Sequence, residues 1–423
     1  MAQIAVVGAG YVGLSAAACL TELGHDVVST DNNAALIDSL RNGDVQIHEP
    51  NLPELVLRGL RSGKLKFTVD SSAVVTTAQF VILCLPTPTM HGGSADISAL
   101  VDFVTSHSQA FSANSIVITK STVPVGTTRR LSSVVGRPEV KFASNPEFVR
   151  EGSTVSDFMN PDRILIGAES AEIGAVVGSL YQRVEAPVLI TAVETAELVK
   201  YVSNAFLATK VSFANSLTEL CESYQVDVHE VLKVVGLDHR IGGEYLRPGP
   251  GWGGSCLPKD VDALLAMARE QGVSLELIEA ARKENQRHQA RVTERILDQI
   301  PRRRGVVHVL GMAFKAGTDD VRDSPAVAIT TSLLKAGVEV QFFDPAAKKV
   351  PLELRTARVL QHNLDDVGKA DVIALLTDWP EFQEIDPVQL TKETQCRVVV
   401  DTRNALDKRR WVAAGFNYLG IGR

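Results

Sequence analysis

Short apolar runs alternate with helical patterns in the first part of the chain. Residues 4–7 and 27–30 have the apolar character of buried strands. The segment between them, residues 12–23, has helical spacing and ends at Gly24. Further strands are predicted at residues 80–85, 116–119 and 164–166. Because strands that alternate with helices form parallel sheets covered by helices on both faces, this pattern predicts an α/β domain.

The middle of the chain has a different pattern. Residues 188–235 contain neither Gly nor Pro, and Leu198, Val202 and Phe206 recur at helical spacing. A helical pattern of this length predicts a helix that connects two domains. Asp227 is expected to cap the start of a second helix.

The alternation of strands and helices returns after residue 300. Strands are predicted at residues 306–310, 338–343, 371–376 and 398–400, and a helix at residues 326–335. With roughly 150 residues per domain, 423 residues allow two or three domains. We therefore predict an α/β fold of two Rossmann-like, doubly wound parallel-sheet domains, joined by a helical middle with a long central helix. The expected boundaries are residues 1–190, 191–300 and 301–423.

Composition and charge narrow the classes of function. A hydrophobic content of 45% with 22% charged residues is typical of a globular protein. The net charge of −7 argues against a nucleic-acid binder, and the basic runs at residues 302–304 and 408–410 are interpreted as solvated turns. No stretch of about 20 residues is apolar enough to span a bilayer. Five scattered cysteines without a C-x-x-C pair indicate a reducing compartment and no zinc site. We expect a cytoplasmic protein without a metal, a nucleic-acid partner or a membrane partner.

A glycine motif indicates a cofactor site. The segment GAGYVG (residues 8–13) follows a predicted strand, opens a helix, and precedes an acidic residue at the end of the next strand. This is the full context of a dinucleotide-binding turn, in which the helix N-terminus holds the pyrophosphate. A carboxylate at Asp31 with no Lys or Arg in the next nine positions favours NAD over NADP. A glycine-rich turn without a ligand is the alternative. The predicted contacts are Gly8, Gly10, Tyr11, Val12, Gly13 and Asp31.

A cysteine in a glycine-rich segment is the candidate nucleophile. Cys256 lies in GPGWGGSCLPKD (residues 249–260), which we expect to run into a helix at Asp260. A thiol near a helix N-terminus and beside Lys259 has the electrostatic environment that favours a thiolate. The cysteines in helix or strand patterns are interpreted as inert small apolar residues: Cys19, Cys84, Cys221 and Cys396.

Two polar residues share one face of the predicted central helix. Lys200 and Asn204 are four positions apart, and an ammonium with an amide is able to hold a developing oxyanion. The apolar neighbours Leu198, Val202 and Phe206 favour burial of this stretch. Two solvent-facing polar side chains are an equally good interpretation of the spacing.

Two carboxylates lie in a loop that follows a predicted strand. Glu147 and Glu151 belong to SNPEFVREG (residues 144–152). A glutamate in such a loop acts as a general acid or base if burial raises its pKa. A capped turn with solvated charges is the alternative.

These segments, in this order, resemble the UDP-glucose/GDP-mannose dehydrogenase family over nearly the whole chain. The matching segments are residues 8–13, 84–88 (CLPTP), 121–127 (STVPVGT), 145–152, 198–208, 249–260, 314–315 and 343–345. The resemblance implies an NAD-dependent four-electron oxidation of a nucleotide sugar, in which a hydroxymethyl group becomes an aldehyde and then a carboxylate. The leading expectation is oxidation of UDP-glucose to UDP-glucuronate, and GDP-mannose or a UDP-N-acetylhexosamine is the nearest alternative substrate.

The resemblance also implies catalytic roles. Cys256 would attack the aldehyde to give a thiohemiacetal and then a thioester, and Glu147 would activate water for hydrolysis. Lys200 and Asn204 would stabilise oxyanions. The full implied catalytic set is Cys256, Lys200, Asn204, Asp260, Glu147 and Thr122.

Binding residues are implied by the same resemblance. Further NAD contacts would be Thr87, Thr122, Glu151, Lys259 and Arg322. Substrate contacts would be Glu147, Phe148, Lys200, Asn204, Arg240, Tyr245, Gly249, Gly253 and Lys315. The resemblance implies a homodimer or higher homo-oligomer that pairs through the long helix, with Arg240 reaching the partner's substrate. Two positions depart from the family: Leu36 stands where a basic residue is frequent, and Asn51 replaces a common Gly.

Two other classes of function stay open. A two-electron β-hydroxyacid dehydrogenase shares the N-terminal domain and a helical middle, but it would not need Cys256. A non-enzymatic NAD-binding module would have no use for a nucleophile, a base and an oxyanion pair together. The number of NADH molecules formed per sugar separates the first of these classes from the leading expectation.

Overall fold

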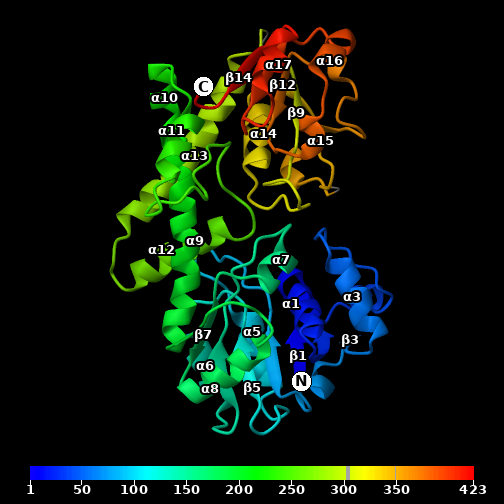
Figure 1. Ribbon diagram of the computed structural model, residues 1–423, viewed down its shortest axis with the longest axis vertical. Coiled ribbons are helices and arrows are strands. Elements are labelled where there is room, and N and C mark those ends of the chain that lie inside the picture. The colour runs from blue at the N-terminus through cyan, green and yellow to red at the C-terminus, as the bar shows by residue number, and fades with distance from the viewer. Residues whose placement is uncertain (302–304, 348) are drawn as a thin grey trace. The chain divides into compact units, whose positions relative to one another are not determined.

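The structure, a computed structural model, describes residues 1–301, 305–347 and 349–423, and the chain divides into two compact units (Figure 1). Unit 1 comprises Met1–Ser203 and Asp262–Gln271, and unit 2 comprises Asn204–Val261 and Gly272–Arg423. The basic turn predicted at residues 302–304 lies outside the described residues.

Unit 1 is built on an eight-stranded sheet with the order β3-β2-β1-β4-β5-β6-β7-β8. The strands are β1 (Gln3–Val7), β2 (Asp26–Thr30), β3 (Leu65–Thr68), β4 (Phe80–Leu83), β5 (Ile116–Thr119), β6 (Lys141–Ser144), β7 (Ile164–Ala168) and β8 (Val188–Thr191). Neighbouring strands run parallel, except that β6 and β7 are antiparallel. The first six strands therefore have the Rossmann order.

Helices cover this sheet and form two apolar layers with it. Alternate residues of a strand point to opposite faces, so Ile4 and Val6 of β1 join one core cluster and Ala5 and Val7 join another. Burial on both faces explains why the strand is a continuous apolar run. The helices are α1 (Tyr11–Glu22), α2 (Ala34–Arg41), α3 (Leu52–Arg61), α4 (Ser71–Val75), α5 (Ser98–Ser106), α6 (Thr127–Val135), α7 (Thr154–Met159) and α8 (Ala171–Gly178), with a 3₁₀ turn at Ser179–Tyr181.

Unit 2 contains a six-stranded parallel sheet with the order β11-β10-β9-β12-β13-β14, which is again the Rossmann order. The strands are β9 (Val306–Leu310), β10 (Glu339–Phe343), β11 (Arg358–Val359), β12 (Val372–Leu375), β13 (Val398–Asp401) and β14 (Asn417–Gly420). The helices are α14 (Pro325–Lys335), α15 (Pro380–Gln383), α16 (Pro387–Glu393) and α17 (Lys408–Ala413), with 3₁₀ turns at Leu352–Leu354 and Val367–Lys369. The predicted fold class is confirmed.

One basic segment of unit 2 differs from the prediction. The exposed residues 408–410 form the first turn of a helix, α17, and not a turn between elements. Asp407 caps this helix by accepting hydrogen bonds from the N–H groups of Arg409 and Arg410. The sequence signal of this helix is the capping carboxylate of Asp407, which an interpretation based on the basic run alone does not consider.

The middle of the chain is helical but is not one helix. The stretch predicted as a single pattern contains the strand β8 and three helices, α9 (Val193–Ser216), α10 (Thr218–Tyr224) and α11 (Val228–Gly236). Asp227 caps α11 as predicted, with its carboxylate accepting from the His229 N–H. Two further helices follow, α12 (Leu257–Glu270) and α13 (Glu276–Leu297). None of the helices in the described part of the chain combines the length and apolar character needed to cross a membrane.

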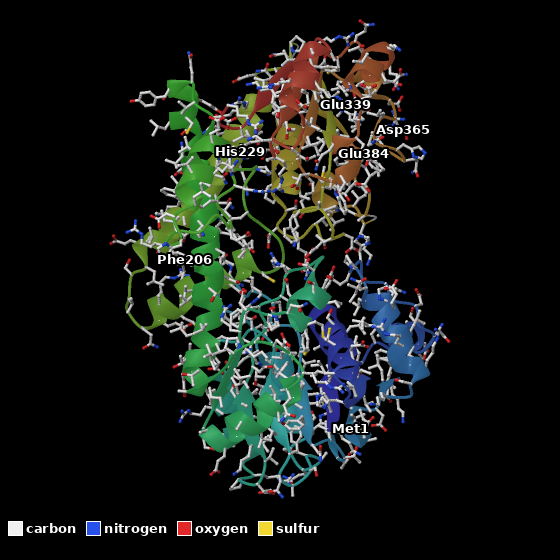
Figure 2. All side chains as sticks on the ribbon, in the orientation of Figure 1. Met1, Phe206, His229, Glu339, Asp365 and Glu384 are labelled. Atoms are coloured by element: carbon white, nitrogen blue, oxygen red, sulfur yellow. The ribbon has the colours of Figure 1, made fainter. Side chains whose placement is uncertain are left out.

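The long helix α9 has two different faces. Leu198, Val202 and Phe206 are 40%, 49% and 63% exposed, so the expectation that they mark a buried stretch is wrong. Their spacing of four aligns them in one exposed stripe, which includes the Phe206 side chain labelled in Figure 2. Lys200 and Asn204 are nevertheless buried, because they lie on the other side of the helix.

Candidate active site

The glycine motif forms the turn between β1 and α1. Gly8 has a φ of +95°, and a Cβ there would lie 2.5 Å from the carbonyl oxygen of Cys84. A Cβ on Gly13 would lie 1.9 Å from the carbonyl oxygen of Gly8, so only glycine lets the helix approach the strand end. A Cβ on Gly10 would meet no described atom within 4 Å. The turn thus presents a helix N-terminus and open space at the point where β1 and β4 adjoin, which fits a pyrophosphate.

Asp31 lies directly after β2 and faces this turn. Its carboxylate accepts hydrogen bonds from the Ala9 N–H at 2.8 Å and from the Asn33 N–H at 2.9 Å. A carboxylate oxygen has more than one lone pair, so both oxygens keep acceptor capacity for ribose hydroxyls. Leu36, in the first turn of α2, packs partly against the core of unit 1. The residues present therefore fit NAD.

The predicted threonines of unit 1 lie together. The Thr87 hydroxyl donates a hydrogen bond of 2.9 Å to the Thr122 carbonyl and so ties the loop after β4 to the loop after β5. The Ser121 hydroxyl adds a second tie by donating to the Leu85 carbonyl at 2.6 Å. Both loops lie at the carboxyl edge of the sheet, where dinucleotides bind in this fold. Glu151 lies in the turn before α7 and is half-buried.

Glu147 and Lys200 form a buried pair within unit 1. The Lys200 ammonium lies 3.0 Å from the Glu147 carboxylate, which also accepts from the Val149 N–H at 2.7 Å. Burial, the strongest single influence, raises the pKa of Glu147. The Lys200 charge and hydrogen bond, the Val149 N–H and the Lys120 charge together outweigh burial, so the pKa of Glu147 is lowered. Glu147 is therefore a carboxylate at neutral pH, and the raised pKa on which the predicted acid–base role depended is not found.

Phe148 follows Glu147 and contacts two cations. The Lys200 Nζ lies 5.5 Å from the ring centroid, and the Arg163 guanidinium carbon lies 3.9 Å from it. Cation–π attraction of this kind stabilises the orientation of the ring. The predicted substrate residues Glu147, Phe148 and Lys200 therefore form one cluster.

Cys256 lies at the N-terminus of α12. The helix begins at Leu257, three residues before the predicted start, and the Asp260 N–H donates to the Cys256 carbonyl at 2.9 Å. Cys256 is thus the N-cap residue, and its half-buried Sγ lies 3.5 Å from the Ser255 Oγ. The positive end of the helix dipole favours a thiolate at this position.

Asp260 is the buried centre of a second cluster, which lies in unit 2. Its carboxylate accepts from the Asn204 Nδ2 and from the Lys259 Nζ, each at 2.6 Å. The first of these bonds joins α9 to the first turn of α12, next to Cys256 in the chain. Lys259, which we expect to contact NAD, is therefore paired with Asp260 in this structure.

The other four cysteines lie in environments that suppress reactivity. Burial raises the pKa of Cys19 and of Cys84 to about 12, and it also raises the pKa of Cys221 and of Cys396. These four side chains are therefore protonated thiols at neutral pH and poor nucleophiles. In the described part of the chain, no group of three or more His, Cys, Asp or Glu side chains is arranged to hold a metal ion.

The glycine-rich segment before Cys256 packs closely against a later loop of unit 2. A Cβ on Gly253 would lie 2.0 Å from the carbonyl oxygen of Asp323. Gly254 has a φ of +87°, and its Cβ would touch the ring of Phe314. Lys315, a predicted substrate contact, has its Nζ 5.7 Å from the centroid of that ring. The glycines are thus required by close packing of this segment.

Three other predicted binding residues lie in loops of unit 2. Tyr245 has a left-handed φ of +63° in the loop before the glycine-rich segment. Arg240 is exposed and pairs with Asp238 at 2.6 Å. Arg322 pairs with Asp320 at 2.7 Å.

Three polar residues that the sequence pattern did not mark contact the segment that is predicted to bind the substrate. Asn215 on α9, and Asn285 and His288 on α13, hydrogen-bond to the backbone of residues 249–252. A single polar residue in a helical pattern carries no signal of the loop that it contacts, because that loop is distant in the sequence. Only the folded structure identifies them.

The β1–α1 turn and the carboxylate after β2 define a dinucleotide-binding protein. Comparison with known families agrees. Residues 2–185 match the NAD binding domain, residues 194–287 the central domain and residues 308–408 the UDP binding domain of one family. The chain belongs to the UDP-glucose/GDP-mannose dehydrogenase family and is an NAD-dependent nucleotide-sugar dehydrogenase.

Individual relatives match over the full chain. UDP-glucose 6-dehydrogenase TuaD of Bacillus subtilis (strain 168) is 38% identical, over 100% of this chain and 94% of the relative. UDP-glucose 6-dehydrogenase of Rhizobium meliloti (strain 1021) is 36% identical, over 100% of this chain and 99% of the relative. Among solved structures, a UDP-glucose dehydrogenase from Pyrobaculum islandicum has a TM-score of 0.91 at 34% identity, covering 100% of this chain and 98% of that one. A UDP-D-ManNAc dehydrogenase from Pyrococcus horikoshii has a TM-score of 0.86 at 30% identity, with 99% of each chain covered.

Proposed function

We propose that this enzyme oxidises UDP-glucose to UDP-glucuronate through a covalent intermediate on Cys256. The observation that carries the proposal is the placement of Cys256 as the half-buried N-cap of α12, whereas burial raises the pKa of each of the other cysteines. The UDP binding domain match and the UDP-glucose 6-dehydrogenase relatives support the choice of substrate.

The covalent sequence balances over two oxidations. Loss of a hydride and a proton converts the hydroxymethyl group into an aldehyde. The Cys256 thiolate then adds to the aldehyde carbon, and the resulting oxyanion takes a proton to give a thiohemiacetal. Loss of a second hydride and a proton gives a thioester, and water cleaves the C–S bond to release the carboxylate and the thiolate. The β1–α1 turn and Asp31 would hold NAD, and one NAD molecule would supply the hydride acceptor for each oxidation.

Each proposed oxyanion donor is paired with a carboxylate. Lys200 pairs with Glu147, and Asn204 pairs with Asp260. A cationic or amide donor stabilises a developing oxyanion, and the adjacent carboxylate accepts a proton. The lowered pKa keeps Glu147 ionised at neutral pH, and we propose that this carboxylate takes a proton from the hydrolytic water. Thr122 is proposed to support the same reaction.

The stoichiometry of NADH tests the reaction class. We expect two NADH per molecule of UDP-glucose, and much slower reaction with GDP-mannose and with UDP-N-acetylhexosamines. A ratio near one would identify a two-electron dehydrogenase and contradict the thioester. A preference for a UDP-N-acetylhexosamine would retain the proposed reaction and contradict the proposed substrate. This substrate is included because of the similarity to the UDP-D-ManNAc dehydrogenase.

A matched pair of cysteine variants tests the nucleophile. Cys256→Ser should lower overall turnover on the order of a thousandfold or more, because an alcohol is a poor nucleophile at neutral pH. The dissociation constants for NAD and UDP-glucose should stay within about threefold. Cys221→Ser, which alters a buried thiol in α10, should retain turnover within about twofold. Normal turnover in Cys256→Ser would exclude the covalent step.

We also propose that the enzyme is a homodimer that pairs through the exposed α9 stripe of Leu198, Val202 and Phe206. An exposed apolar row on a long helix is typical of a subunit interface. Phe206→Glu should shift the molar mass in light scattering from dimer to monomer. Val412→Glu, at an exposed apolar position on α17, should leave the mass unchanged.

A further inference from the structure

The glycine-rich segment Gly249–Trp252 is held at its first residue by two buried side chains. The Asn215 Oδ1 accepts from the Gly249 N–H at 2.9 Å, and the His288 Nε2 donates to the Gly249 carbonyl at 2.7 Å. A carbonyl oxygen only accepts, so the neutral imidazole carries its proton on Nε2. Both polar groups of the Gly249 backbone are thereby satisfied by α9 and α13.

The last residue of the segment is held in the same way. The Asn285 Oδ1 accepts from the Trp252 N–H, and the Asn285 Nδ2 donates to the Trp252 carbonyl, each at 2.9 Å. The side-chain amide thus pairs with the N–H and the C=O of one residue, as a neighbouring antiparallel strand would. The indole Nε1 donates to the Ser212 Oγ at 2.8 Å, which orients the ring.

These contacts are buried and restrict the conformation of the Gly249–Trp252 segment. Asn215, Asn285 and His288 are all buried, so water does not compete for their hydrogen bonds. Gly251 has a φ of +130°, and a Cβ there would lie 2.8 Å from the Asn285 Oδ1 and 2.9 Å from the Gln289 Nε2. Glycine alone lets the chain pass this close to α13.

The held segment leads directly to the nucleophile. Trp252 is followed by Gly253, which packs against the Asp323 carbonyl, and Cys256 caps α12 shortly after. The direction in which the chain leaves Trp252 therefore affects where the thiol lies. None of the three anchoring side chains has a role in the proposed chemistry.

We propose that Asn215, Asn285 and His288 are positioning residues that hold the Gly249–Trp252 backbone in the conformation that binds the nucleotide sugar and directs Cys256 at it. The inference rests on the proposed function, in which this segment contacts the substrate. On this proposal, the affinity for the nucleotide sugar depends partly on α9 and α13, the helices that carry the three side chains. NAD binding, which belongs to the β1–α1 turn, should be independent of them.

Two substitutions at one position test the inference. His288→Leu keeps a similar volume but removes the donor, whereas the side-chain amide of His288→Gln can donate from the place of the imidazole Nε2. We expect His288→Leu to raise the KM for UDP-glucose about tenfold or more, because a buried carbonyl loses its partner. His288→Gln should stay within about threefold of the wild type. The NAD dissociation constant should stay within about twofold in both variants.

A core variant on the same helix separates positioning from general loss of stability. Val292→Ala leaves a cavity in the core of unit 2 and touches none of the anchoring hydrogen bonds. An equal rise in KM in Val292→Ala would overturn the positioning role. If His288→Leu does not fold, Asn215→Ala gives the same test with a smaller loss of stability. The Asn215 Nδ2 is buried without a partner among the described residues, so its removal breaks no hydrogen bond.

The outcomes for the wild type and the variants are distinguishable. A wild-type enzyme that oxidises no nucleotide sugar would overturn the proposed function and, with it, this inference. A wild type that forms two NADH per sugar, with unchanged KM in His288→Leu and Asn215→Ala, would overturn the inference alone. A rise in the NAD dissociation constant equal to the rise in KM would also overturn it.

Discussion

The two units have sheets of the same strand order but differ in the segment that connects the first strand to its helix. In unit 1, β1 ends at Val7 and α1 begins at Tyr11. In unit 2, β9 ends at Leu310 and α14 begins only at Pro325. The N-terminus of a helix therefore lies directly after the strand in unit 1 but not in unit 2. This difference places the phosphate-binding geometry in unit 1.

The glycine directly after the first strand is common to both units. Gly8 and Gly311 each have a φ of +95°. A Cβ on Gly8 would collide with the Cys84 carbonyl, and a Cβ on Gly311 would lie 2.3 Å from the Cβ of Thr377. In each unit the collision is with the segment after the fourth strand in chain order. In each unit, the loop after the first strand lies so close to the loop after the fourth strand that only glycine fits at this position. The glycine is therefore not by itself evidence of a cofactor.

The acidic residue after the second strand acts differently in the two units. Asp31 accepts from the Ala9 N–H of the first turn. Asp344 accepts from both the Met312 N–H at 2.7 Å and the Ala313 N–H at 2.9 Å. Asp344 thus occupies two backbone donors of the turn after β9, whereas Asp31 occupies one donor of the turn after β1. We expect no second NAD site at that turn.

The largest effect that we predict is on the stability of unit 2. Asp344→Ala removes the acceptor of four backbone N–H groups, those of Met312, Ala313, Ala346 and Ala347. The free energy of unfolding should fall by about 3 kcal/mol or more, since each unpaired donor costs about 1 kcal/mol. The urea midpoint measures this loss, and the NAD dissociation constant should stay within about twofold. A weakened NAD complex with an unchanged midpoint would refute the contrast between the units.

Acid should destabilise unit 2 through two buried histidines. Burial lowers the pKa of His288 from 6.5 to about 4, and it also lowers the pKa of His308 on β9. As the pH falls below 6.5, the unfolded chain binds protons that the folded chain does not, so stability is lost. For His288 this loss occurs between pH 6.5 and about 4. For His288 the loss reaches about 3 kcal/mol at the lower end of this window.

Hydrogen exchange at pH 7 and pH 5 locates this acid effect. Protection of β9 and α13 should decrease more than protection of β1 and α1. His288→Gln, which does not titrate, should reduce the dependence on pH. An equal loss of protection in both units, unaffected by this variant, would exclude the two histidines as the cause.

Replacement of Asp31, the acidic residue after the second strand of unit 1, should weaken NAD binding and leave the stability nearly unchanged. Asp31→Ala should raise the NAD dissociation constant about 10- to 100-fold, because a charged acceptor for the ribose hydroxyls is lost. The unfolding midpoint should change little, since only two backbone hydrogen bonds end at Asp31 among the described residues. The preference for NAD over NADP should also shrink, and fluorescence titration with both dinucleotides measures each effect. An Asp31→Ala variant that loses stability as Asp344→Ala does would show that the two acids act alike.

Features with a local signal were predictable from the sequence. The strands β1 and β9, the glycine turn and the position of Cys256 near a helix N-terminus are all determined by neighbouring residues. Asn51 also has a local explanation: its φ of +65° lies in the left-handed region, where glycine is preferred and asparagine is tolerated.

Features that depend on distant residues were not predictable. The pKa of Glu147 is lowered by Lys200, which is contributed by a different element. The spacing of Leu198, Val202 and Phe206 indicates an apolar stripe but not whether the chain itself covers it. The anchoring of Gly249 by His288 likewise joins two helical regions that are separate in sequence. In each case the deciding contact is long-range.

The smallest effect concerns the residue five positions after each acid. In unit 1 this residue is Leu36, and in unit 2 it is the exposed Lys349. Leu36→Arg adds a cation near the expected ribose and pyrophosphate and should lower the NAD dissociation constant about two- to fivefold, the range of an exposed ion pair. Leu36→Gln provides an uncharged control of similar length. The gain should vanish at about 1 M salt, where the Debye length is about 3 Å. An equal gain in Leu36→Gln, or a gain that persists in salt, would show that packing of α2 and not charge controls the affinity.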